Sequence, residues 1–155
     1  MVLGRHQQTA RPSLIVTGPA AAGKTTTLLH VVRTCHLAPH PHGQTVGRPL
    51  PVAYVLVPPG ATAKTLAAEF ARYLGIPVTP RMTQTQITES VCHTYNQAGV
   101  RLVLIDEIHR VNPRTTGAET ADLIKDLTER IAATFVYAGS TSHRRPCSPV
   151  SAVPS

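Results

Sequence analysis

Four short, almost continuous apolar runs set the strongest limit on how this chain of 155 residues can fold. They are rich in β-branched and aromatic residues and do not alternate with polar ones, which is typical of strands buried on both faces of a parallel sheet. Segments with helical periodicity lie between the runs. Alternating strands and helices predict an α/β fold, a parallel sheet flanked by helices. The predicted strands are residues 14–17, 52–57, 101–105 and 134–138, and the predicted helices are residues 25–35, 62–74, 85–97 and 117–132.

The rest of the chain divides around this predicted core, residues 13–140. Residues 1–12 are expected to form a flexible arm, and the proline- and glycine-rich residues 37–51 a loop. The last fifteen residues, 141–155, hold three prolines and four serines without an apolar period, so we expect a disordered tail. Thr116 and Glu119 have the spacing of a capping box at the start of the last helix.

The composition of the chain indicates its cellular compartment more clearly than its function. No apolar stretch reaches the ~18 residues of a membrane span and no signal peptide is visible, so we expect a cytoplasmic protein. The three cysteines, Cys35, Cys92 and Cys147, have neither disulfide nor zinc spacing. The net charge of +7 lies entirely in residues 1–105, with nine basic and two acidic side chains, since residues 106–155 carry six of each. A basic half suits a phosphate-bearing partner, and it equally suits a solvated arginine-rich surface.

A phosphate-binding sequence follows the first predicted strand. The pattern G-x-x-x-x-G-K-[ST] has backbone amides that surround a phosphate, and the next helix directs its positive end to the same point. The lysine supplies charge for the β- and γ-phosphates, and the hydroxyl of the following residue can ligate Mg²⁺. We therefore predict that a nucleoside triphosphate binds here. The loop is Gly18, Pro19, Ala20, Ala21, Ala22 and Gly23, and Lys24, Thr25 and Thr26 follow it.

A second acidic site closes the third predicted strand, where Asp106 and Glu107 follow the run 102–105. In the P-loop arrangement, Asp106 would hold Mg²⁺ through its water shell and Glu107 would polarise the attacking water. An adjacent glutamate favours hydrolysis over transfer of the phosphoryl group to another substrate. The pair would also suit the cap of a following helix.

With both motifs, the chain resembles the AAA+ ATPases and, within them, the TniB-type helper ATPases of bacterial transposition. The resemblance covers roughly residues 10–140 and rests on residues 17–25, 98–109, 58–59, 74–77 and 135–139. It implies a P-loop NTPase sheet with the two motif strands side by side, ATP and Mg²⁺ as cofactors, homo-oligomers, and work on DNA with a transposase-type partner. It also implies that Lys24 and Thr25 bind phosphate and Mg²⁺, and that Asp106 binds Mg²⁺ and Glu107 activates water. A polar sensor residue is expected at Ser140 or Thr141.

The chain departs from this family after the fourth predicted strand. A complete AAA+ module continues with a fifth strand, an arginine finger and a helical lid, whereas Arg144 and Arg145 stand in the proline-rich tail. We therefore expect a truncated or frame-shifted core, with the phosphate-loop strand at the sheet edge and weak or absent hydrolysis.

Two other functions remain open at this point. Asp106-Glu107-Ile108-His109 has the D-E-x-H form of a helicase motif, although a second helicase domain is not apparent. The chain would also suit a nucleotide-binding module, or a remnant, that does not hydrolyse ATP.

Overall fold

A computed structural model of the chain describes residues 13–38, 50–111 and 117–140. The predicted arm, the tail with Thr141, Arg144, Arg145 and Cys147, most of the 37–51 loop and the capping residue Thr116 lie outside these ranges. Within the described residues, no helix is long and apolar enough to cross a membrane.

Strands and helices alternate as the apolar runs predict, so the chain has an α/β fold. Element bounds agree with the predicted ones to within two residues, because each run ends at a change of period or at a turn residue. Gly75 and Gly99, both at positive φ, follow the second and third helices. The elements are β1 (Ser13–Gly18), α1 (Lys24–Leu37), β2 (Val52–Leu56), α2 (Ala63–Tyr73), α3 (Gln84–Gln97), β3 (Leu102–Asp106), the short 3₁₀ helix η1 (Ile108–Arg110), α4 (Gly117–Arg130) and β4 (Thr134–Ser140).

The four strands form one parallel sheet in the order β1-β4-β3-β2. The expectation that the two motif strands are neighbours is therefore wrong, because β4 lies between β1 and β3. Strand β4 pairs on one side with Ser13–Gly18 and on the other with Leu102–Ile105. Apolar periodicity does not specify the order of strands, since all four runs are equally suited to an interior position.

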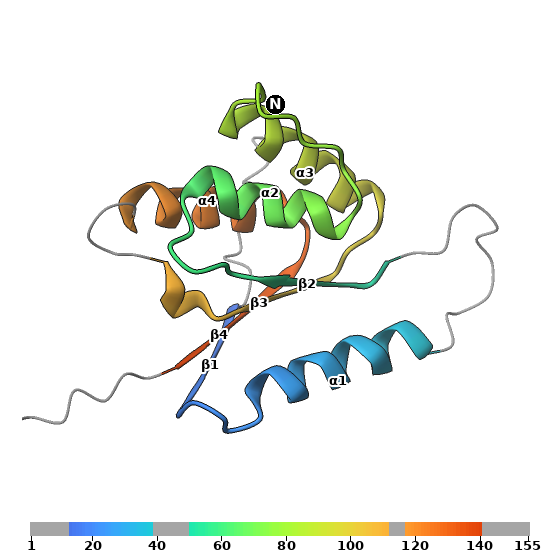
Figure 1. Ribbon diagram of the computed structural model, residues 1–155. Helices are drawn as coiled ribbons and strands as arrows, with labels where there is room; N and C mark the ends of the chain where they lie inside the picture. Colours follow the sequence, from blue (N-terminus) through green and yellow to red (C-terminus); the bar gives the residue numbers. More distant parts are fainter. Residues whose placement is uncertain (1–12, 39–49, 112–116, 141–155) are drawn as a thin grey trace, which may run out of the picture.

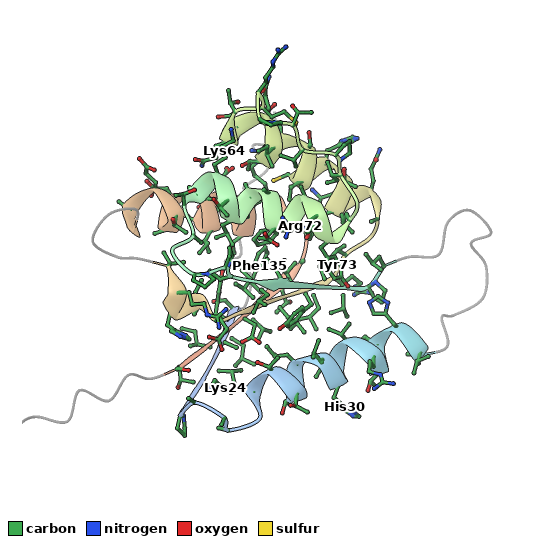
Figure 2. The ribbon with its side chains drawn as sticks, viewed as in Figure 1. Lys24, His30, Lys64, Arg72, Tyr73 and Phe135 are labelled. Carbon is green, nitrogen blue, oxygen red and sulfur yellow. The ribbon has the colours of Figure 1, made fainter. Side chains whose placement is uncertain are left out.

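Helices cover both faces of the sheet and enclose two apolar cores. Figure 1 shows α1 alone on one face and α2, α3 and α4 on the other, with α3 packed on α2. The larger core lies under these three helices and includes Phe135 of β4, which Figure 2 labels between the sheet and α2. The smaller core joins Leu28 of α1 to Leu104 of β3 and Val136 of β4. Strands β2, β3 and β4 thus contribute to both cores, which explains their continuous apolar sequences, whereas β1 contributes Val16 to the smaller core alone.

Specific polar contacts fix the helices over the larger core. Thr83 and Gln86 form a complete capping box at the start of α3. The buried hydroxyl of Tyr95 donates to the Phe70 carbonyl at 3.0 Å, which ties α3 to α2. The Asn96 amide donates to the Arg130 carbonyl, at 3.0 Å, and accepts from the Ala132 amide, at 2.8 Å, at the end of α4.

Among the described strands, β1 lies at the edge of the sheet and pairs with β4 alone. Its apolar side chains are correspondingly open to solvent: Leu14 is 57% exposed and Ile15 is 70% exposed. This arrangement agrees with the predicted edge position of the phosphate-loop strand.

Candidate functional site

The carboxyl ends of the parallel strands meet at one edge of the sheet, which is where α/β folds place their ligand sites. In Figure 1 this edge lies to the left, where the loop between β1 and α1, η1 and the end of β4 come together. These segments enclose an open cavity of about 370 Å³, a size suited to a small molecule. Its lining residues are Ala20, Ala21, Ala22, Gly23, Lys24, Thr25, Thr26, Glu107, His109 and Ser140.

The loop before α1 has the backbone of an anion site. Gly23 adopts a left-handed conformation (φ 79°), and so does Ala21 (φ 61°), which is uncommon for a residue with a side chain. Gly23 is the N-cap of α1, and no side chain caps the helix there. The first turn of α1 carries no acidic residue. Amide groups at the start of α1 thus border the cavity together with the positive end of the helix dipole.

Lys24 lies at the junction of this loop and α1 (Figure 2). Its ammonium donates hydrogen bonds to the carbonyls of Gly18, at 2.9 Å, and Pro19, at 2.7 Å. Gly18 and Pro19 therefore contact the lysine rather than the cavity, whereas the other predicted loop residues through Thr26 line it.

Asp106 is the best-connected polar group of the site, although it is fully buried. Its Oδ2 accepts the hydroxyl of Thr25, at 2.6 Å, and the hydroxyl of Tyr54, at 2.9 Å. Its Oδ1 accepts the amide of Glu107, at 2.8 Å. Three donors offset the cost of burying a carboxylate.

Tyr54 was not predicted as a site residue, because in the run 52–57 it reads as one more strand residue. It belongs to β2, the neighbour of β3, and that adjacency brings its hydroxyl to Asp106. Burial, together with the hydrogen bond to Asp106, raises the pKa of Tyr54 well above its ordinary value of 10.0, so the phenol is a donor at neutral pH. Tyr54 could not be predicted as a site residue because the sequence does not show that β2 and β3 are neighbours.

Glu107 occupies a strained turn between β3 and η1. Its backbone is left-handed, with φ 60° and ψ 35°, and it is the N-cap of η1 without a side-chain capping bond. Its Oε2 lies 3.1 Å from Nε of Arg110 and 3.3 Å from Nε2 of His109. Arg110 also donates to the carbonyl of Val57, at 3.3 Å, at the end of β2. Such strain at a non-glycine residue is common in functional sites.

Of the two sensor candidates, Ser140 lines the cavity, and Thr141 lies outside the described residues. The Ser140 amide donates to Nδ1 of His109 at 3.1 Å.

Outside this site, His36, next to Cys35, contacts the Val52 carbonyl at 3.2 Å. No cluster of three or more metal-ligating side chains occurs among the residues described.

The residues present fit a nucleotide with Mg²⁺. The amides of the loop and the Lys24 ammonium suit phosphate oxygens, and the cavity is large enough for a small molecule. The Thr25 hydroxyl and the Asp106 carboxylate, already in contact, are the hard oxygen donors that Mg²⁺ prefers.

The parallel sheet, with the phosphate-loop sequence between its first strand and first helix, has the α/β P-loop fold of AAA+ type. The crystal structure of Cdc6p from Pyrobaculum aerophilum is similar, with a TM-score of 0.54 and 18% identity over 83% of this chain. This chain covers 33% of that protein, and the likeness concerns the fold alone. A family model described as bacterial TniB protein matches residues 2–147, so the chain belongs to the TniB family. No curated protein sequence matches it.

Proposed function

We propose that the chain binds ATP with Mg²⁺ in this cavity and hydrolyses it slowly, as the nucleotide-dependent component of a bacterial transposition system. The observation that carries the proposal is the contact between Thr25 and Asp106 beside an uncapped helix N-terminus. These are the two oxygen donors that a P-loop site needs for Mg²⁺.

Each predicted residue has a role in this proposal. Residues 20–23 and the amides of Thr25 and Thr26 would surround the phosphates, and Lys24 would exchange the carbonyls of Gly18 and Pro19 for phosphate oxygens. Thr25 ligates Mg²⁺, and Asp106 holds the ion through bound water. Bound Mg²⁺ supplies charge neutralisation for the phosphates.

Glu107 is the proposed general base for the attacking water. Its Oε2 already contacts Arg110 and His109, so water competes with two donors for that oxygen. This competition is the physical reason for proposing slow turnover by the chain alone. General base catalysis typically contributes roughly 10²- to 10⁴-fold, so restraint of this group has a measurable effect.

The wider role follows from the family. We propose assembly of ATP-bound copies on DNA, with a transposase-type protein partner, in the cytoplasm. The net charge of +7 supports contact with DNA phosphates.

A pair of lysine variants tests nucleotide binding. Lys24→Ala should weaken binding of a fluorescent ATP analogue about 10- to 100-fold or more, since hydrogen bonds to charged groups contribute about 1.5–3 kcal/mol each. The matched control is Lys64→Ala on α2, an exposed lysine whose ammonium contacts the Pro80 carbonyl. Unchanged affinity in Lys24→Ala would refute the phosphate-loop assignment. Competition with GTP identifies the preferred base.

Hydrolysis is tested by single-turnover assays with and without DNA. Glu107→Gln should bind MgATP normally and lose turnover. A second candidate function, nucleotide binding without hydrolysis, is favoured by the two contacts that engage Glu107. Tight binding with no phosphate release by the unaltered chain, even with DNA, would establish that second function instead.

A further inference from the structure

His109 contacts both the proposed base and the end of β4. Its Nε2 lies 3.3 Å from Oε2 of Glu107, and its Nδ1 accepts the backbone amide of Ser140 at 3.1 Å. All three residues line the same cavity. One imidazole ring therefore bridges two walls of the site.

The Ser140 contact determines which ring nitrogen carries the proton. A backbone amide can only donate, so Nδ1 must accept and the proton of the neutral ring is on Nε2. The nitrogen that carries this proton lies 3.3 Å from Oε2 of Glu107. The bridge thus has a direction, from the Ser140 amide through the ring to Oε2.

Close packing of η1 on β4 holds the ring in place. A Cβ atom at Gly139 would lie 3.0 Å from Cγ2 of Ile108 and 3.6 Å from both the amide nitrogen and Nδ1 of His109. Glycine at this position therefore permits the close approach of η1. The backbone amide of Ser140 holds one edge of the ring, although 40% of the His109 side chain is exposed.

His109 and Arg110 restrain Glu107 from different directions. Both contact Oε2, and among the described residues no donor contacts Oε1. Arg110 donates to the Val57 carbonyl, which follows β2. Neither of these two residues lines the cavity. In the described part of the chain, the His109 bridge connects Glu107 to Ser140, a cavity residue at the end of β4.

We propose that His109 is a positioning residue for Glu107: it fixes Oε2, leaves Oε1 to accept a proton from water, and transmits the position of the β4 end to the carboxylate. This inference rests on the proposed hydrolysis at the same site. A shift of Ser140 on contact with a bound ligand would reorient the base through a single side chain.

Two near-isosteric variants separate the two contacts. His109→Gln places an amide nitrogen near the position of Nε2 and keeps a donor for Glu107. His109→Asn places an amide oxygen near the position of Nδ1, which keeps the Ser140 contact but does not reach Glu107. His93→Asn on α3, an exposed histidine away from the cavity, is the matched control.

We expect His109→Asn to lower kcat about tenfold, a fraction of what a general base supplies, with affinity for MgATP unchanged within about twofold. His109→Gln should recover most of that loss. Wild-type kcat in His109→Asn, beside an inactive Glu107→Gln, would overturn the positioning role and leave the proposed function intact. An equal loss in both histidine variants would also overturn it, since the donor to Glu107 would then be irrelevant.

A second measurement does not depend on turnover. Long-range ¹H–¹⁵N spectra of the labelled protein, assigned with His109→Asn, should show the proton of the His109 ring on Nε2. The Nε2 resonance should shift in Glu107→Gln. A proton on Nδ1 would overturn the bridge. If the unaltered chain binds ATP without hydrolysing it, the proposed hydrolysis fails, and these spectra still decide whether His109 holds Glu107.

Discussion

The hydroxyl of Thr25 donates to Oδ2 of Asp106 at 2.6 Å, although 81 positions separate the two residues in the chain. Thr25 is in the first turn of α1 and Asp106 ends β3. The contact joins residues that follow β1 and end β3, two strands that β4 separates in the sheet. The two halves of the proposed metal site are thus joined by a direct hydrogen bond.

Removing the Asp106 charge should affect binding of MgATP selectively. Asp106→Asn is expected to weaken MgATP about 10- to 100-fold, because the metal loses its anionic partner, and to leave metal-free ATP unchanged or slightly tighter. Titration of ATP with Mg²⁺ and with EDTA checks this. Asp122→Asn, an exposed aspartate of α4, is the control. Equal weakening under both conditions would argue against a metal role.

The Tyr54 hydroxyl orients the same carboxylate, so Tyr54→Phe should reproduce a milder form of that effect. We expect MgATP affinity to fall by up to about tenfold and stability by about 1 kcal/mol, the usual worth of one hydrogen bond. Tyr73→Phe removes a hydroxyl that donates to the Val52 carbonyl, at 3.0 Å, on the same strand as Tyr54. That control should lose stability without losing Mg²⁺ dependence, and any matching loss of MgATP affinity would contradict the assignment.

Gly139→Ala should press on the Ile108 side chain of η1, which must move by a few tenths of an ångström to make room. The added methyl group would lie 3.0 Å from Cγ2 of Ile108, and overpacking of this kind typically costs about 1–3 kcal/mol. Turnover should fall along with stability, because Glu107 and His109 flank Ile108. Adding Ile108→Ala removes the opposing carbon and should restore part of both, as measured by urea unfolding and single-turnover assays. If the stability losses of the two substitutions simply add in the double variant, positions 139 and 108 are not in steric contact.

Stability should fall at alkaline pH. Burial raises the pKa of Tyr95 and Tyr73 above their ordinary value of 10.0, and the pKa of Cys92 above 9.0. The unfolded chain loses these protons at the ordinary values and the folded chain keeps them. Their contribution is therefore complete below about pH 8 and is lost as pH rises further.

Urea unfolding at about pH 8 and about pH 10.5 measures this alkaline decline. Tyr95→Phe should be less stable at neutral pH by about 1–3 kcal/mol, since the buried Phe70 carbonyl loses its donor, and should show a shallower decline. Identical slopes in both proteins would assign the effect to other groups.

The sequence predicted the elements well because each apolar run ends where its period changes. Strand β3, for example, stops at Asp106, the first charged residue after four apolar ones. The phosphate loop could also be predicted from the sequence, because its conformation depends on neighbouring residues. Glycine takes the left-handed position before α1, and lysine is the first residue of the helix.

What the sequence did not predict depends on contacts between distant segments. The position of β4 between β1 and β3 depends on pairing between distant segments, and the similarly apolar sequences of the strands do not specify it. Tyr54 reaches Asp106 only because β2 pairs with β3. The bridge from Ser140 through His109 similarly requires that η1 and β4 approach each other at Gly139.

The edge position of β1 links two equilibria that are usually treated separately. Among the described residues, the strand that carries the phosphate loop pairs with β4 alone, and an edge of this kind can accept a further strand. A ligand that immobilises the loop also stabilises this edge, and a segment that pairs with the edge favours the conformation of the loop that binds the ligand. Thermodynamic reciprocity makes the two effects equal in size. Nucleotide affinity is therefore expected to depend on whether a segment pairs with the outer edge of β1.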